Sequence, residues 1–272
     1  MVSVIVLTYN HEKYIRQALD SILMQEVDFK YEVLVGDDCS TDKTTELLQG
    51  YINGKEDIIQ LYVREKNIGP SKNLYQLLQV AKGKYIAFCE GDDYWADVHK
   101  LQKQIQFLEE NIGIIGCTHR CEIVNENGVP MIRKLNWISE KEYFSLQDFQ
   151  GYILPGQLGT LVCRNIFLST KHDFSVIYKA HPIVSDRTLM FLLLLHGEIY
   201  VLCEKMSCYR IINDGSNATA FMFENNADVN LLQCQLTKKL EEYARTEFQI
   251  KVRFTRFKIE QYIKYCVKKI IR

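Results

Sequence analysis

Several features are missing from this sequence, and each absence removes a class of protein. The longest apolar run, Leu189 to Leu195, is far too short to cross a bilayer. Net charge is only −1, with 33 Lys and Arg against 34 Asp and Glu, so nothing in the charge favours nucleic-acid binding. The N-terminus shows no basic region and no cleavage site, so we expect no signal peptide.

Glycine-rich phosphate loops are also missing. The pattern Gly-x-Gly-x-x-Gly does not follow the first apolar run, which disfavours a Rossmann dehydrogenase. A nucleotidyltransferase or pyrophosphorylase would show a glycine-rich loop there, whereas Thr8-Tyr9-Asn10-His11-Glu12 contains no glycine. The sequence has no internal repeat, and a content of 47% hydrophobic and 25% charged residues is typical of a globular protein.

The nine cysteines are odd in number and scattered along the chain. Without a secretory signal, this pattern predicts reduced thiols in a cytoplasmic protein. Cys117 and Cys121 have a spacing that suggests metal ligands. They lack a second pair at zinc spacing and lie in a strand-like segment, so we interpret them as structural.

The first half of the chain alternates strands and helices. Short apolar runs predict strands over 2–7, 31–36, 58–63 and 85–89, and helical spacing predicts helices between them. We expect Ser40 or Thr41 to cap the second helix and Pro70 to begin the third. This alternation predicts an α/β fold with a mostly parallel central sheet flanked by helices.

The second half is less regular. The pattern predicts a helix around Leu101 to Leu108, strands over 114–124 and 160–163, a buried helix over 185–195, and a strand and turn over 197–212. From about Phe221 the chain reads as long helices in which Lys and Arg outnumber Glu.

The last of these helices has an apolar stripe made by Ile259, Ile263, Cys266 and Ile270. A basic amphipathic helix of this kind can rest on an anionic membrane surface. The alternative is a solvated helix whose apolar stripe packs on the main domain or on a partner subunit.

Acidic residues follow two of the predicted strands. Asp37 and Asp38 end the second strand, and Glu90-Gly91-Asp92-Asp93 ends the fourth. Packed carboxylates repel one another unless a cation lies between them, and open α/β sheets bind ligands at this edge. The pattern therefore indicates a divalent metal, Mn²⁺ or Mg²⁺, that carries a phosphorylated ligand. The simpler alternatives are a helix-terminus carboxylate at Asp38 and an acidic turn at Asp92 and Asp93.

Together these elements resemble the family-2 glycosyltransferases, which have the nucleotide-sugar-binding GT-A fold. The matching elements, in order, are Val2-Ser3-Val4-Ile5-Val6-Leu7-Thr8-Tyr9-Asn10, Asp37-Asp38-Cys39-Ser40-Thr41-Asp42, Asn67-Ile68-Gly69-Pro70-Ser71-Lys72-Asn73, Ala81-Lys82-Gly83-Lys84-Tyr85-Ile86 and Glu90-Gly91-Asp92-Asp93-Tyr94-Trp95. They cover about residues 1–110. Weaker elements at Gly156-Gln157-Leu158-Gly159, Ser185-Asp186 and Tyr209-Arg210 extend the match to about residue 215.

The resemblance implies a domain organisation. A GT-A domain would occupy residues 1–220, with a nucleotide-binding half over 1–110 and an acceptor half over 111–220. Residues 221–272 would form a basic helical C-terminal appendage.

The resemblance also implies roles for individual residues. The nucleotide pocket would be lined by Thr8, Tyr9, Asn10, Asp38, Asn67, Gly69, Lys72 and Asp92. Asp93, helped by Asp92, would hold the metal. Glu90 stands where the family usually has Asp, so its role toward the metal stays open. Arg210 would either help to bind the diphosphate or form a structural ion pair.

The expected reaction is transfer of a sugar with inversion at the anomeric carbon. A base must take the proton of the acceptor hydroxyl, and Asp186 is the candidate because it resembles the acid of the family's usual Glu-Asp pair. Ser185 replaces the Glu of that pair. The alternative is that Asp186 only caps the helix that it begins.

We therefore predict an inverting, metal-dependent glycosyltransferase that acts in bacterial surface polysaccharide synthesis. A UDP-sugar is the favoured donor, and the acceptor is a glycan or lipid-linked glycan. We expect a cytoplasmic protein. A peripheral position on the inner face of the cell membrane is left open, and so is the oligomeric state. The alternatives are a non-catalytic nucleotide-sugar-binding partner subunit and a nucleotidyltransferase.

Overall fold

The core of the protein is a sheet whose first half is parallel. A computed structural model describes residues 1–181, 185–212 and 228–271. Strands β3, β2, β1 and β4 lie side by side in that order and all run parallel. Every residue of β1 is buried, because helices cover both faces of the sheet. These strands confirm the predicted ones, and their bounds are Val2–Thr8 (β1), Tyr31–Asp37 (β2), Ile59–Val63 (β3) and Tyr85–Glu90 (β4).

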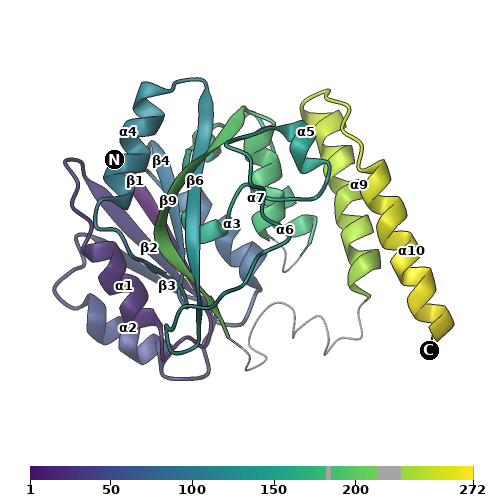
Figure 1. Cartoon of the computed structure of the whole chain (residues 1–272). Helices are drawn as coiled ribbons and strands as arrows, with labels where there is room; N and C mark the ends of the chain where they lie inside the picture. The colour runs from purple at the N-terminus through teal and green to yellow at the C-terminus, as the bar shows by residue number, and fades with distance from the viewer. Residues whose placement is uncertain (182–184, 213–227, 272) are drawn as a thin grey trace.

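The second half of the sheet is mixed. Strand β8 pairs antiparallel with β4 and with β6, and the long strands β6 and β9 are parallel (Figure 1). Two short strands, β5 and β7, pair antiparallel with β9. Because β5 follows the acidic residues directly, its pairing brings them beside the end of β9. The bounds are Tyr94–Trp95 (β5), Ile114–Asn125 (β6), Tyr143–Phe144 (β7), Val162–Arg164 (β8) and Glu198–Ile211 (β9).

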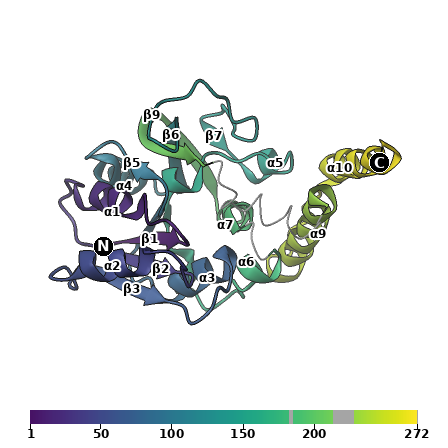
Figure 2. The same cartoon turned by 90° about the horizontal axis from the view of Figure 1, so that it is seen from below.

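Helices form a layer on each face of this sheet (Figure 2). One layer, α1, α2 and α4, packs on one face, and α3, α6 and α7 cover the other. The bounds are Ile15–Leu23 (α1), Thr44–Ile52 (α2), Pro70–Val80 (α3), Lys100–Glu110 (α4), Leu146–Phe149 (α5), Val176–Lys179 (α6) and Ser185–Leu194 (α7), with 3-10 turns at Leu158–Thr160 and Ile166–Leu168. This arrangement confirms the predicted α/β fold.

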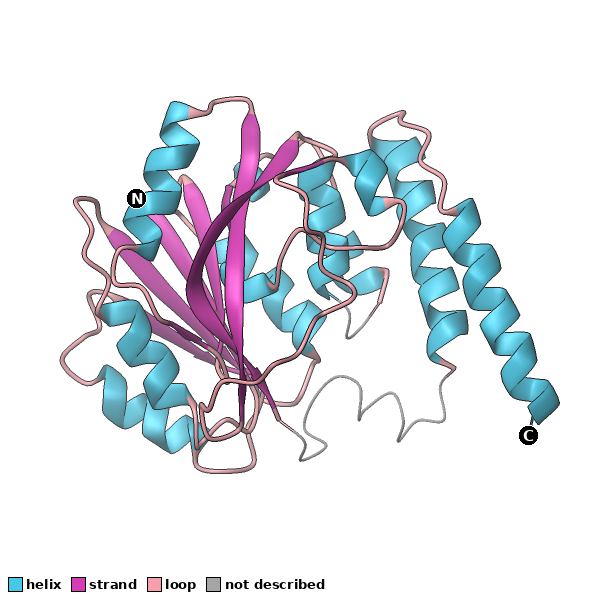
Figure 3. Cartoon of the chain, in the orientation of Figure 1, coloured by secondary structure: helices cyan, strands magenta, loops and turns pink. Residues whose placement is uncertain are grey.

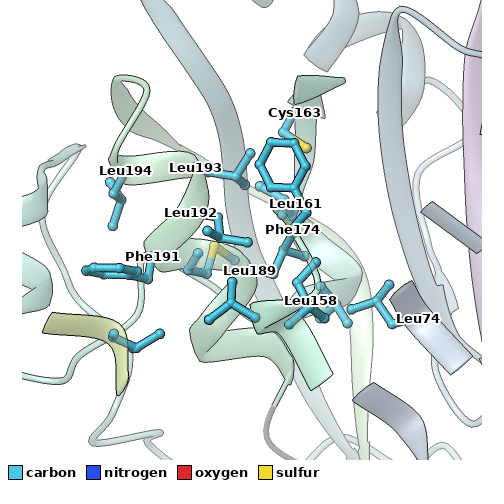
Figure 4. Packing of buried hydrophobic residues seen from close by; sticks show 14 of the residues in the cluster. Leu74, Leu158, Leu161, Cys163, Phe174, Leu189, Phe191, Leu192, Leu193 and Leu194 are labelled. Carbon is cyan, nitrogen blue, oxygen red and sulfur yellow. The ribbon is translucent and has the colours of Figure 1, made fainter. Parts of the chain in front are cut away.

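Helix α7 is buried on almost every side, as its apolar sequence predicts. Its side chains from Leu189 to Leu194 lie in the main core with Leu74, Leu158 and Phe174 (Figure 4). A helix held this firmly fixes the position of its first turn, where Asp186 lies.

The chain ends in two antiparallel helices, α9 (Val229–Glu247) and α10 (Thr255–Ile271), which lie at one side of the protein (Figure 3). Leu236 and Leu240 of α9 are buried in the main core, as is Phe257 in the first turn of α10. The Phe257 ring stacks on Tyr152 at 4.1 Å between centroids. The start of the appendage is therefore part of the core, and the predicted boundary at residues 220 and 221 lies outside the described residues.

Two further findings concern the whole described part of the chain. None of the helices in the described ranges has both the length and the apolar character needed to cross a bilayer. All nine cysteines are free, and Cys117 is fully buried beside Gln104, whose side-chain amide donates to the Cys117 carbonyl at 3.0 Å.

Candidate functional site

Three strand ends meet at one edge of the parallel sheet. In the register of the sheet Thr8 pairs with Asp37, and Leu7 pairs with Glu90. Backbone hydrogen bonds continue this pairing past the strands, from Asp38 N–H to the Thr8 carbonyl at 3.0 Å and from Gly91 N–H to the Leu7 carbonyl at 2.8 Å. The structure thus brings together the polar segments that follow β1, β2 and β4.

The segments after β1 and β2 are tied to each other by side chains. Asn10 has a positive φ of 57°, and its Oδ1 accepts from Thr41 N–H at 2.7 Å. Its own N–H donates to Ser40 Oγ at 2.9 Å. These contacts occupy both predicted cap residues, and α2 begins only at Thr44, so the predicted cap is wrong. The N-cap of α2 is Lys43, which makes no side-chain cap bond, and the preceding Asp42 accepts from Thr44 N–H at 2.9 Å through its Oδ1.

The two carboxylates at the end of β2 differ in what they contact. Asp37 is fully buried and accepts from the hydroxyls of Ser40 and Thr45, so it holds the turn. Asp38 accepts from the N–H groups of Ile68 and Gly69, both at 2.8 Å. Burial raises the pKa of Asp38, and these two hydrogen bonds oppose the increase.

The segment before α3 is the one that the resemblance assigns to the nucleoside. Gly69 adopts φ 84°, which favours glycine, and its N–H also lies 3.1 Å from Asn67 Oδ1. Asp38, Asn67 and Gly69 therefore lie together. Lys72 is exposed on α3, and its Nζ lies 5.9 Å from the centroid of the Tyr178 ring on α6.

The acidic turn, Glu90 to Asp93, is tightly packed. A Cβ on Gly91 would lie 2.7 Å from His11 Nδ1 and 2.8 Å from Thr8 Oγ1, so the close approach of the β1 segment requires glycine. Asp92 is partly exposed, with its Oδ2 3.9 Å from His11 Nε2. Asp93 is buried, and its Oδ1 accepts from Arg210 N–H at 2.7 Å.

The carboxylates of the acidic turn destabilise one another's charge. Burial, followed by the charges of Asp92 and Asp186, raises the pKa of Glu90 to about 8. Burial, followed by the charges of Asp92 and Glu90, raises the pKa of Asp93. A cation between these carboxylates would relieve the repulsion, and carboxylate oxygens are the ligands that Mg²⁺ and Mn²⁺ accept. Among the described residues, no group of three or more His, Cys, Asp or Glu is arranged so that it could hold a metal ion.

Asp186, far away in sequence, lies close to the acidic turn. Its charge contributes to the raised pKa values of Glu90 and of Tyr209, although burial is the larger cause for both. Its Oδ1 accepts from Arg187 N–H at 2.7 Å, and Arg187 is held over the Tyr152 ring at 4.0 Å. The carboxylate that the sequence suggests as a base thus lies within electrostatic range of the cluster that the sequence suggests for the donor.

Arg210 supports the acidic turn from inside the protein. The side chain is 5% exposed and lies between the rings of Tyr14 and Tyr94. Its Nε donates to the Asp92 carbonyl and an Nη to Gln17 Oε1, both at 2.7 Å. The other Nη donates to the Glu126 carbonyl at 3.0 Å. Protein acceptors thus occupy Nε and both Nη atoms of the guanidinium, and the two predicted roles of Arg210, diphosphate binding and a structural ion pair, both stay predictions.

Two residues near the acids were missed by reasoning from the sequence. Burial, followed by the charges of the acidic turn and Asp186, raises the pKa of Tyr209. Its place beside Arg210 in the Tyr-Arg element was the available signal. His11 contacts the acidic turn but carries no motif, so only the folded chain identifies it.

Comparisons with known proteins agree with this geometry. The family profile described as Glycosyl transferase family 2 matches residues 3–167. TuaG of Bacillus subtilis, provisionally named a teichuronic acid biosynthesis glycosyltransferase, is 39% identical over 164 residues, 60% of this chain and 62% of TuaG. This chain spans less than two thirds of the length of several curated relatives, 58% of three mycobacterial proteins and 62% of TuaG.

Solved structures share the fold. Staphylococcus aureus TarS (residues 1–349), in complex with UDP-GlcNAc, superposes with a TM-score of 0.58 and 22% identity over 96% of this chain and 79% of TarS. The mannosyltransferase PcManGT from Pyrobaculum calidifontis, in complex with GDP-Man and Mn²⁺, superposes with a TM-score of 0.54 and 16% identity. The match covers 89% of this chain and 63% of PcManGT. The family profile covers more than half of the sequence, and the fold and the strand-end motifs agree with it. This chain belongs to glycosyl transferase family 2.

Proposed function

We propose that this protein transfers a sugar from a nucleotide-sugar to a hydroxyl of a glycan or lipid-linked glycan, with inversion, in bacterial surface polysaccharide synthesis. The observation that carries the proposal is the meeting of three strand-end motifs at one edge of the sheet, within electrostatic range of Asp186. The glycosyltransferase names of the relatives support it.

The donor would lie along the ends of β1, β2 and β4. The nucleotide contacts would come from Thr8, Tyr9, Asn10, Asp38, Asn67, Gly69, Lys72 and Asp92. A UDP-sugar is favoured because TarS binds UDP-GlcNAc, while PcManGT binds GDP-Man, so both bases need to be tested.

The acidic turn would hold Mn²⁺ or Mg²⁺ through Asp93 and Asp92, with Glu90 close by. Such an ion, when bound, neutralises the charge that develops on the departing diphosphate. The protein contributes the carboxylates and the support that fixes them. Arg210 holds the backbone of Asp92, and its N–H holds the carboxylate of Asp93.

Asp186 would act as the general base. The acceptor oxygen forms its bond to the anomeric carbon while the bond from that carbon to the diphosphate oxygen breaks, and the acceptor proton moves to Asp186. Attack from the face opposite the leaving group inverts the anomeric configuration. The buried α7 supports this role because it holds Asp186 in place.

We also propose a peripheral position on the cytoplasmic face of the membrane. Beyond its buried first turn, α10 presents Ile259, Tyr262, Ile263 and Val267 with 47 to 61% of each side chain exposed. The protein should co-sediment with liposomes that contain anionic lipid. The double variant Ile259→Ser, Ile263→Ser should no longer co-sediment, while its core stays folded. A failure to bind anionic liposomes would favour a partner subunit as the cover of this stripe.

The central experiment measures transfer and slow hydrolysis with UDP-, GDP- and dTDP-sugars in the presence of Mn²⁺. Asp186→Asn should lower turnover by about 10²- to 10⁴-fold while leaving donor binding intact, as expected for a general base. Asp173→Asn, a carboxylate near α6, is the matched control. Unchanged turnover in Asp186→Asn would remove the base assignment, and unchanged metal dependence in Asp93→Ala would remove the metal assignment. Nucleotide binding without any turnover would indicate a non-catalytic subunit.

A further inference from the structure

A cavity lies within residues 111–220, the segment that the resemblance assigns to the acceptor. It has a volume of about 240 Å³ and lies between β6, the segment that leads to β7, and Gln157. That segment passes over β6 and β9 in Figure 2. The volume is slightly below the roughly 300–1,000 Å³ of sites for drug-sized ligands, so it suits a single sugar-sized group.

The wall of this cavity is strongly basic. Arg120, Arg133, Lys134 and Lys205 line it against a single acid, Glu140. The excess is three positive charges, or two when Glu122, which pairs with Lys205 at 2.7 Å, is included. The chain as a whole has a net charge of −1, so this concentration of positive charge is local.

The basic side chains have different tasks. Arg120 donates to the carbonyls of Ser139 and Glu140 at 2.7 and 2.9 Å, which fastens the covering segment to the strand. Lys134 is exposed and pairs with Glu140 at 2.6 Å. Arg133 has neither an ion pair nor a hydrogen bond within the described ranges, and it remains available to a ligand.

An unpartnered buried donor provides independent evidence of a ligand. Gln157 lines the cavity and is only 9% exposed. Its Nε2 has no hydrogen-bond partner within the described part of the chain. A buried amide N–H without an acceptor costs about 1–3 kcal/mol, and an anionic oxygen in the cavity would satisfy it.

The cavity is adjacent to the acidic turn. Gln157 lies two residues before Gly159, where a Cβ would be 3.8 Å from Asp93 Oδ2. Cys121 is on the cavity wall, and after burial the charge of Asp93 is the largest cause of its raised pKa. A negatively charged acceptor would be repelled by Asp186, and the basic cavity offsets this repulsion.

We propose that this cavity binds the anionic group, phosphate or carboxylate, of an acidic saccharide acceptor. The proposal rests on the proposed glycosyl transfer and specifies its acceptor class. The donor is assigned to the ends of β1, β2 and β4, so the cavity should affect acceptor binding without affecting UDP binding.

The test uses the full chain with glucose 6-phosphate, glucuronate and neutral glucose as probes, at low ionic strength and with titration followed by NMR. We expect saturable binding of glucose 6-phosphate, glucuronate or both, and none of glucose. Which acid binds identifies the anionic group. The pair Arg133→Gln with Lys134→Gln should weaken that binding about tenfold or more, the effect of losing a charge-assisted hydrogen bond. The exposed pair Lys251→Gln with Arg253→Gln is the matched control.

UDP affinity is measured in parallel on every variant. Binding of UDP but of neither acid, or equal binding of glucose, would overturn the acceptor proposal and leave the donor site intact. Equal affinity for the acids in both variant pairs would also overturn it. Acid binding without UDP binding would support the cavity and contradict the proposed transfer reaction.

Discussion

Replacing Lys100 with methionine should stabilise the protein at neutral pH. Lys100 is fully buried in α4, and its Nζ has no hydrogen-bond partner within the described part of the chain. Its Nζ lies 4.1 Å from the centroid of the Trp95 ring. Burial lowers the pKa of Lys100 to about 7. Methionine keeps an unbranched side chain of similar length and removes the ammonium group.

The magnitude follows from the change in proton affinity. The fall in the pKa of Lys100 from the usual 10.5 to about 7 corresponds to roughly 5 kcal/mol of lost stability, since each tenfold change in proton affinity is worth about 1.36 kcal/mol. A desolvated cation–π contact with Trp95 returns about 2 kcal/mol. Lys100→Met should therefore raise the free energy of unfolding by about 2–3 kcal/mol at pH 7.

The pH dependence gives the sharper test. Between pH 7 and pH 10.5 the unfolded chain keeps the Lys100 proton and the folded chain loses it, so the free energy of unfolding of the parent protein rises with pH. The variant lacks this slope, and its advantage should shrink as the pH increases. Urea unfolding followed by tryptophan fluorescence at pH 7 and pH 9.5 measures both values.

The exposed Lys30→Met provides the control, with no expected change at either pH. An advantage of Lys100→Met that is equal at the two pH values would refute the titration argument. Lower stability of the variant at pH 7 would show that the ammonium group is better accommodated than its surroundings indicate.

Three other substitutions test the supports of the site. Gly91→Ala should weaken UDP binding, because the new methyl group would lie 2.7 Å from His11 Nδ1. An unchanged UDP affinity in calorimetric titration would contradict this. Arg210→Lys should lower both the melting temperature and turnover, because lysine loses the planar fork that holds Asp92, and an effect on neither would deny the supporting role. Phe257→Ala should cost about 3 kcal/mol of stability in urea while UDP affinity stays constant, and a cost near zero would mean that the start of α10 does not belong to the core.

The strands and the acidic turn could be predicted because their signals are local. The first strand is an uninterrupted apolar run, since both faces of the sheet are covered. Parallel pairing then places Thr8 beside Asp37 without further information. Asp186 needed the family resemblance, because its approach to the acidic turn depends on the placement of α7.

Other features depend on contacts that sequence patterns do not encode. Ser40 looked like a helix cap, but the folded chain uses its hydroxyl to connect two loops. The role of Arg210 depends on the pairing of β5 with β9, which joins segments more than one hundred residues apart. The basic cavity combines Arg120 with Gln157 across a covering segment, and neither residue has a recognisable motif.

The contacts of Arg210 have a consequence for protein engineering. This one side chain on β9 joins Gln17 on α1, the backbone of Asp92 and the turn after β6. Residues 1–110 and the segment that follows them are therefore not interchangeable modules. A chimera that takes residues 1–110 from one relative and the remainder from another needs a compatible glutamine, tyrosine and arginine set, or its acidic turn loses the support that shapes it.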